Sequence, residues 1–139
     1  MTRSSIFTLI AVVAVAGLVF GCAGMKKVSN EDQIKAQIKG LEDALKAKDV
    51  KKALTFVADD FDQPDLGDKA KLEELIQMGI DMGYTDDGTL DLTNAKFEVT
   101  GDKATAGPID ASSAAGSVTV QVEFKKVNGK WLATGGGEF

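Results

Sequence analysis

The spacing of apolar residues changes near residue 88 and divides this chain into a helical part and a β part. Before that point, apolar residues recur every three or four positions, which is typical of amphipathic helices. After it, apolar and polar residues alternate, which is typical of half-buried strands. Helices followed by antiparallel strands predict an α+β fold, with two to three N-terminal helices packed on one face of a curved antiparallel sheet.

Three helices are expected, and each has an N-cap residue in the sequence. Ser29 with an acidic residue three positions on predicts a helix over 31–48. Asp49 and Asp68 can cap a second and a third helix, and Gly83 suits the C-terminal end of the third. The residues expected to face the core are Ile34, Ile38, Leu41 and Leu45, then Val50, Ala53, Leu54 and Val57, and finally Leu72, Leu75, Ile76, Gly79 and Ile80.

The β part contains two turn signals and two irregular points. Thr100–Lys103 and Val127–Lys130 predict hairpin turns, and the Asn-Gly pair in the second is the strongest turn signal in the chain. Leu90 and Phe97 lie on opposite phases of the alternation, so a bulge is expected near residues 93–94. The strand expected over 103–112 is rich in small residues and is interrupted by Pro108.

The N-terminus has the features of an export signal. Arg3 precedes an apolar run from Ile6 to Phe20, which is too short to cross a hydrocarbon core of ~30 Å comfortably. Residues 1–21 with Cys22 resemble a bacterial lipoprotein signal, in which cleavage leaves the cysteine N-terminal and lipid-modified. We therefore expect a cleaved signal peptide (1–21), a lipidated cysteine with a tether (22–28) and one domain (29–139). The alternatives are an ordinary cleaved signal and a transmembrane anchor.

Lipidation at Cys22 would also explain why the chain has only one cysteine. A lone cysteine cannot form an internal disulfide, and an exported protein with a free thiol is unusual. Ala23 is not the aspartate that favours inner-membrane retention in Gram-negative lipoproteins. The expected location is the bacterial cell envelope, lipid-anchored to the outer membrane and facing the periplasm.

The composition restricts the chemistry available to the domain. The chain has no histidine, its only arginine is Arg3, and its formal net charge is −5. An acidic chain without clustered lysine and arginine is not expected to bind nucleic acid. Without histidine, catalysis would depend on carboxylates, lysine, serine, threonine or Tyr84. No cofactor is expected.

An acidic loop precedes the third helix and raises the question of calcium. Its carboxylates are Asp59, Asp60, Asp62, Asp65 and Asp68. Clustered carboxylates suit a hard cation, but Pro64 stands where a ligand would be needed, and no bidentate glutamate follows at the EF-hand distance. We expect Asp68 to cap a helix, Asp59 and Asp60 to be solvated, and no metal site to form.

Two segments, ALKAKDVKKALTFVADDF (44–61) and VEFKKVNGKWLATG (122–135), resemble the NTF2-like superfamily, which includes the SnoaL and ketosteroid-isomerase proteins. The resemblance implies a cone-shaped barrel with a cavity, and dimerisation through the sheet. It also implies that the catalytic tyrosine position of ketosteroid isomerase is Leu41 and the oxyanion aspartate position is Val120. The general base would fall where Asp62 and Gln63 compete for the position. This pattern argues against that isomerase activity.

Two function classes follow from these observations. The first is a membrane-tethered, non-catalytic module that binds a small apolar ligand or an envelope protein partner, as a monomer or a homodimer. The second is a small isomerase, dehydratase or hydrolase that uses Asp62 or Asp110 with Tyr84. The residues expected at a pocket are Tyr84, Asp110, Asp62, Trp131 and Met78, with Trp131 expected to anchor the core while its indole N–H reaches the rim.

Overall fold

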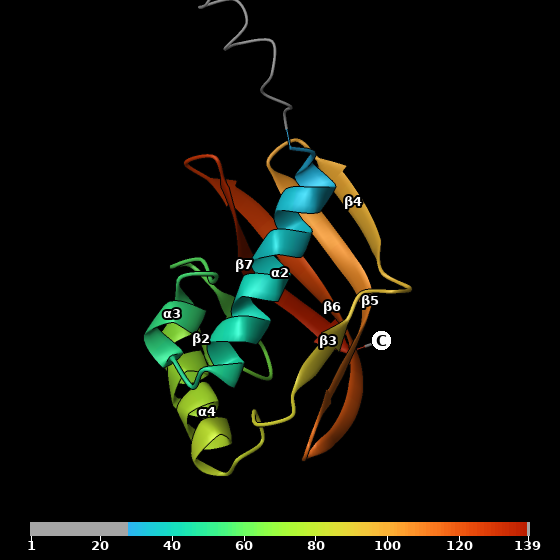
Figure 1. The fold of residues 1–139 in the computed structure, drawn as a ribbon. Coiled ribbons are helices and arrows are strands. Elements are labelled where there is room, and N and C mark those ends of the chain that lie inside the picture. Colours follow the sequence, from blue (N-terminus) through green and yellow to red (C-terminus); the bar gives the residue numbers. More distant parts are fainter. Residues whose placement is uncertain (1–27, 139) are drawn as a thin grey trace, which may run out of the picture.

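A computed structural model describes residues 28–138, so the predicted signal peptide and Cys22 lie outside the described residues. The helices are α2 (Asn30–Lys46), α3 (Val50–Leu54) and α4 (Lys69–Asp81). The strands are β1 (Asp62–Gln63), β2 (Gly67–Asp68), β3 (Thr89–Asp91), β4 (Lys96–Thr100), β5 (Lys103–Ser113), β6 (Gly116–Val127) and β7 (Lys130–Glu138). Helix α2 crosses one face of the main sheet, while α3 and α4 lie next to the C-terminal half of α2 (Figure 1).

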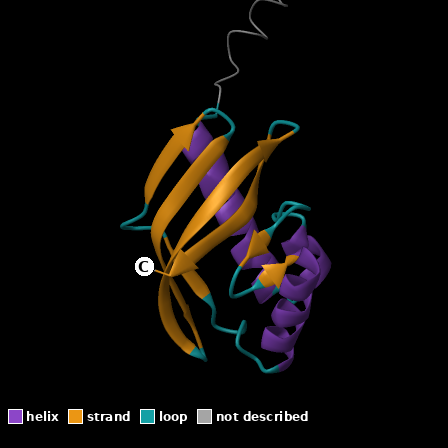
Figure 2. Cartoon of the chain, turned by 180° about the vertical axis from the view of Figure 1, so that it is seen from behind, coloured by secondary structure: helices purple, strands orange, loops and turns teal. Residues whose placement is uncertain are grey.

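The α+β prediction is confirmed. The main sheet is antiparallel and has five strands in the order β3–β5–β6–β7, with β4 also paired to β5. It curves around α2 without closing, and Figure 2 shows that no described helix covers its other face. No helix within residues 28–138 is long and apolar enough to span a bilayer.

The three predicted N-caps are confirmed. The Ser29 hydroxyl accepts a hydrogen bond from the backbone N–H of Asp32 at 3.2 Å. The Asp49 and Asp68 carboxylates accept from backbone N–H groups three residues on, at 3.0 and 2.9 Å. Each bond satisfies one of the amide groups that a helix start leaves without a partner.

The second and third helices differ from the prediction. Helix α3 ends at Leu54, and Val57 instead forms a parallel bridge with Ala133 of β7. In α4 only Ile80 is fully buried, whereas the other residues expected to face inward, Leu72, Leu75, Ile76 and Gly79, are half-buried. These residues are less buried because α4 contacts mainly α3 and β2 and does not pack on the main sheet.

The irregular points in the sheet also differ in detail. The expected bulge near residue 93 is a full interruption, which separates β3 from β4 while both pair with the same strand, β5. Pro108 does not interrupt β5, but the register of β5 against β6 shifts between Ala106 and Ile109. The shift accommodates a residue that cannot donate a ladder hydrogen bond.

Both hairpin turns are confirmed. Thr100 pairs with Lys103 across a turn in which Gly101 has a φ of 60°. Val127 pairs with Lys130, and Asn128 and Gly129 have φ values of 51° and 79°. Positive φ at both central residues is the geometry that Asn-Gly favours in two-residue hairpins.

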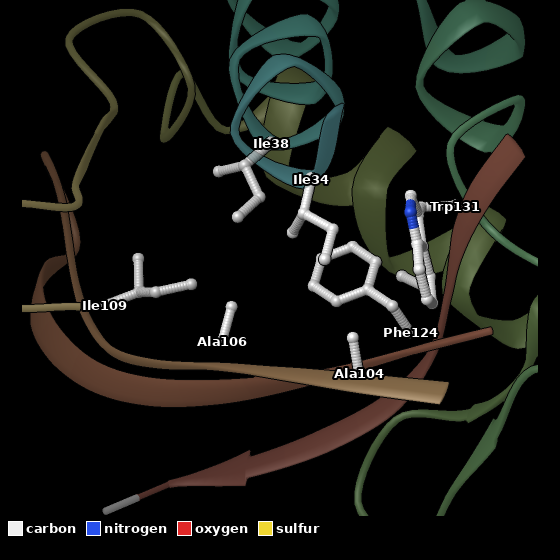
Figure 3. Packing of buried hydrophobic residues seen from close by; sticks show 8 residues of the cluster. Ile34, Ile38, Ala104, Ala106, Ile109, Phe124 and Trp131 are labelled. Carbon is white, nitrogen blue, oxygen red and sulfur yellow. The ribbon is translucent and has the colours of Figure 1, made fainter. Parts of the chain in front are cut away.

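The core lies between α2 and the sheet (Figure 3). Its fully buried members are Ile34, Ile38, Ala104, Ala106, Ile109, Phe124, Trp131 and Ala133. Two alanines of β5, Ala104 and Ala106, share this cluster with Ile34 and Ile38 of α2. Trp131 anchors the core as predicted, but the prediction for its N–H is wrong. Trp131 is only 1% exposed, so the indole N–H does not reach the rim, and Nε1 has no hydrogen-bond partner among the described residues.

Candidate functional site

A pocket of about 430 Å³, open to solvent, lies at the C-terminal end of α2. Its walls come from that helix end, the segment after α4, strand β3, and the hairpin that joins β5 to β6. The lining residues are Glu42, Leu45, Lys46, Tyr84, Thr85, Gly88, Thr89, Leu90, Ala111, Ser112, Ser113, Ala115, Gly116, Ser117 and Val118.

The pocket surface is mainly apolar because small and aliphatic residues supply most of it. Leu45 and Leu90 face it from α2 and β3, and Val118 contributes from β6. Ala111 and Ala115 remove bulk at the end of the β5–β6 hairpin. The alanines of β5 therefore differ in role: Ala104 and Ala106 belong to the core, whereas Ala111 lines the pocket.

Among the described residues, Glu42 is the one carboxylate in the pocket wall, and its side chain is only 12% exposed. Burial opposes its ionisation, but hydrogen bonds from Lys46 and from the backbone N–H of Leu90 (3.4 Å) outweigh that effect. Lys39 lies 3.6 Å away and adds a favourable charge. The pKa of Glu42 is therefore lowered, and the carboxylate is ionised and already paired at neutral pH.

The three serine hydroxyls of the pocket wall are bonded to neighbouring groups. The Ser112 and Ser117 hydroxyls lie 3.0 Å apart across the β5–β6 pair. The Ser113 hydroxyl accepts from the backbone N–H of Ala115 at 3.1 Å. The Thr85 hydroxyl is buried and has no partner among the described residues.

The structure places one of the five predicted pocket residues, Tyr84, at this pocket, where its side chain is 42% exposed. Asp110 lies on β5 and accepts a hydrogen bond from the Thr119 hydroxyl at 2.7 Å, outside the pocket wall. Asp62 is exposed in β1, Met78 is exposed on α4, and Trp131 is in the core. The described chain therefore does not bring these five residues together.

The two isomerase-equivalent positions are also outside the pocket wall. Leu41 is half-buried on α2, and Val120 packs against the core from β6. Glu42, the neighbour of Leu41, lines the pocket and was missed in the sequence. The spacing of Glu42 and Lys46 predicts an i,i+4 ion pair, but it does not show that the Glu42 carboxylate is largely buried and bonded to Leu90 of β3.

Gln63 is a second residue that sequence reasoning did not identify correctly. It is 8% exposed, donates to the carbonyl of Gly136 at 3.0 Å, and accepts from the N–H of Leu66 at 2.9 Å. The bond to Gly136 holds the small β1–β2 hairpin against β7, and the bond from Leu66 lies within the hairpin. Gln63 is a structural residue of the acidic loop, and it lies outside the pocket wall.

Several carboxylates of the acidic loop have structural partners. Asp68 caps α4, Asp59 lies 3.0 Å from the Lys69 ammonium, and Asp60 lies 2.8 Å from that of Lys125. In the part of the chain that the structure describes, no three Asp, Glu or Cys side chains come together as a metal site would require.

Comparison with sequence profiles of known families and with curated proteins finds no match. Solved structures do match. An NTF2-like protein of unknown function from Shewanella oneidensis is similar with a TM-score of 0.63 and 13% identity, covering 78% of this chain and 97% of the other. A second one, from Shewanella baltica, has a TM-score of 0.62 and 16% identity, covering 81% and 94%.

A protein of unknown function from Nostoc punctiforme, described as having a cystatin-like fold, has a TM-score of 0.62 and 20% identity, covering 80% of this chain and 92% of the other. At these identities the similarity is one of fold. The resemblance seen in the two sequence segments is thus matched by the three-dimensional arrangement, and the chain has an α+β fold of the NTF2-like type.

Proposed function

We propose that this protein is a lipid-tethered, non-catalytic binding module whose pocket at the end of α2 holds one small apolar ligand. The observation that carries the proposal is the pocket itself, a mainly apolar hollow of about 430 Å³ formed by Leu45, Leu90, Ala111 and Val118. A hollow of this size with few polar groups is typical of sites for small molecules.

The ionisable groups of the pocket support binding over turnover. A general base works best with a pKa near the working pH, whereas hydrogen bonds from Lys46 and the Leu90 N–H lower the pKa of Glu42 and occupy its carboxylate oxygens. Asp62 and Asp110, the acids that a catalytic alternative would use with Tyr84, lie outside the pocket wall. The catalytic alternative therefore has no specific geometry in its favour.

Filling the pocket is expected to weaken ligand binding strongly. Ala111→Phe places an aromatic ring in the pocket from β5, and we expect at least a ~10-fold weaker binding of N-phenyl-1-naphthylamine. Native mass spectrometry of the mature protein measures the one-to-one adduct directly. Ala115→Phe fills the same space from the hairpin and is expected to act in the same way.

Ala36→Phe is the matched control, because Ala36 is exposed on α2 and does not line the pocket. It should bind the probe as the unmodified chain does. Equal adduct formation by all of these variants would mean that the pocket is not the binding site.

The same spectra report oligomeric mass, and a homodimer joined through the uncovered face of the sheet is our proposal for the assembled state.

We further propose that Cys22 carries the lipid and that the domain faces the periplasm from the outer membrane. The support is the sequence alone, an apolar run followed by Gly21 and a single cysteine. Acyl chains on one cysteine can anchor a protein that lacks a spanning segment.

Cys22→Ala is expected to leave an uncleaved precursor without incorporated radioactive palmitate, and globomycin should also block cleavage of the unmodified chain. Gly24→Ser, which keeps the cysteine, is the matched control and should be labelled and cleaved. Normal processing of the Cys22→Ala chain would exclude lipidation at this residue.

A further inference from the structure

The negative charge of this domain is concentrated in one segment. Residues 59–87, which comprise the acidic loop, α4 and the turn after it, hold ten Asp or Glu and two Lys. The other described residues hold eleven acidic and eleven basic side chains, so they are formally neutral. The segment containing α4 thus accounts for the net charge of the folded domain.

Helix α4 presents an outer face that no other described element covers. Residues 70, 73, 74, 77, 78, 81 and 82 follow the i, i+3, i+4, i+7 spacing of one helix face and line a shallow groove of about 690 Å³. The opposite face, with Leu72, Ile76 and Ile80, is the one that is partly or fully buried. We call this set of seven residues the α4 outer face.

The α4 outer face combines exposed apolar side chains with acidic ones. Met78 and Met82 are 48% and 58% exposed, among the most exposed large apolar side chains of the described chain. Glu73, Glu74 and Asp81 flank them, and no basic residue of the described chain lines the groove. Flexible methionines can pack against the apolar face of an amphipathic helix, and the surrounding acidic side chains favour a helix whose flanking residues are basic.

Local bonds leave much of this acidic charge available. Glu74 pairs with Lys71 at 2.8 Å, but Glu73 and Asp81 form no ion pair with any residue in the range 28–138. Gly79 lies inside α4 with nothing within 4 Å of where a Cβ would be, so internal packing does not require a glycine there. The missing side chain lets a partner approach the helix backbone beside Met78 and Met82.

We propose that the α4 outer face is a docking surface for a cationic amphipathic helix of a partner protein, which places leucine-like residues on Met78 and Met82 and lysine or arginine beside Glu73 and Asp81. This surface is distinct from the ligand pocket, since the two share no lining residue. An anionic membrane surface is a poor alternative occupant, because the charge of the segment would oppose the approach.

The position of α4 relative to the N-terminal end of the domain favours a protein partner over the membrane. Val28 lies just before α2, and α4 lies at the opposite end of the domain in both views (Figures 1 and 2). A domain anchored through its N-terminus would therefore present α4 away from the bilayer.

The test is a titration of the mature protein, held in neutral-lipid nanodiscs, with a fluorescein-labelled amphipathic helix of leucine and lysine of about four turns. Fluorescence anisotropy should show saturable binding that weakens as salt is raised, because screening reduces attraction between exposed charges. A peptide with glutamate in place of lysine should not bind.

Two variants locate the binding on α4. The double variant Met78→Asn, Met82→Asn should raise the dissociation constant of the leucine–lysine peptide at least ~10-fold. The double variant Glu73→Gln, Asp81→Asn should make that dissociation constant less dependent on salt. The matched controls, Val99→Asn on β4 and Glu98→Gln with Asp102→Asn, change exposed residues outside the α4 outer face and should bind like the unmodified chain.

Several results would overturn the proposal: no binding beyond that of empty nanodiscs, equal binding of the glutamate peptide, or unchanged affinity in the methionine variant. Self-association of the chain that is abolished by the same methionine variant would instead assign the surface to a second copy.

Discussion

Trp131→Ala is expected to lower the free energy of unfolding by about 3–5 kcal/mol, the largest effect of any single substitution considered for this domain. The side chain is only 1% exposed and lies in the cluster that joins α2 to the sheet, with Ile34 and Phe124. Removing it takes away the largest fully buried side chain and leaves a cavity that neighbouring backbone cannot fill. Urea denaturation followed by far-UV circular dichroism measures the loss.

Trp131→Phe is the matched control for this prediction. It retains an aromatic ring and removes the indole N–H, which has no partner among the described residues, so the lost volume is partly offset by the relief of a buried unsatisfied donor. We expect a loss of less than about 2 kcal/mol. If alanine and phenylalanine at this position were equally destabilising, the packing explanation would be wrong.

Gly136→Ala is expected to destabilise the domain by about 1–3 kcal/mol because of a steric conflict in the sheet. A Cβ at Gly136 would lie 2.2 Å from the carbonyl oxygen of Gln121, and the backbone of β6, a central strand, cannot move aside easily. The Gly136 carbonyl also accepts the Gln63 side chain, so displacement of β7 would disturb the β1–β2 hairpin as well. Thermal unfolding detects the change as a lower Tm.

Gly137→Ala separates this steric effect from a general effect of alanine on the strand. Nothing lies within 4 Å of a Cβ at Gly137, which is on the same strand and also pairs with β6. Its Tm should stay close to that of the unmodified protein. A Tm as low as that of Gly136→Ala would show that the close contact with Gln121 is not the cause.

Local features of the fold could be predicted because their causes lie within a few residues. The caps at Ser29, Asp49 and Asp68 each need only a side-chain oxygen near amides three residues on. The Asn128–Gly129 turn needs only two residues that tolerate positive φ. The change from helices to antiparallel strands follows from the same short-range patterns, whereas the short β1–β2 hairpin is not expected from them.

The site could not be predicted in the same way. Glu42 and Leu41 are adjacent on α2, but only Glu42 lines the pocket, because β3 and the β5–β6 hairpin lie on that side of the helix end. Asp110 and Ala111 are adjacent on β5, and only Ala111 lines it. Which neighbour faces the pocket depends on strand register and helix placement, and neither is visible in one sequence.

By itself, the sequence determined the α+β class, the helix starts, the hairpin turns and the apolar residues available for a core, because these depend on short-range hydrogen bonding and periodicity. Only the tertiary structure decided where the pocket forms, that Glu42 is paired and Trp131 fully enclosed, and that α4 keeps an uncovered face. The physical reason is that burial depends on contacts between residues far apart in the chain, which exist only once α2 lies on the sheet.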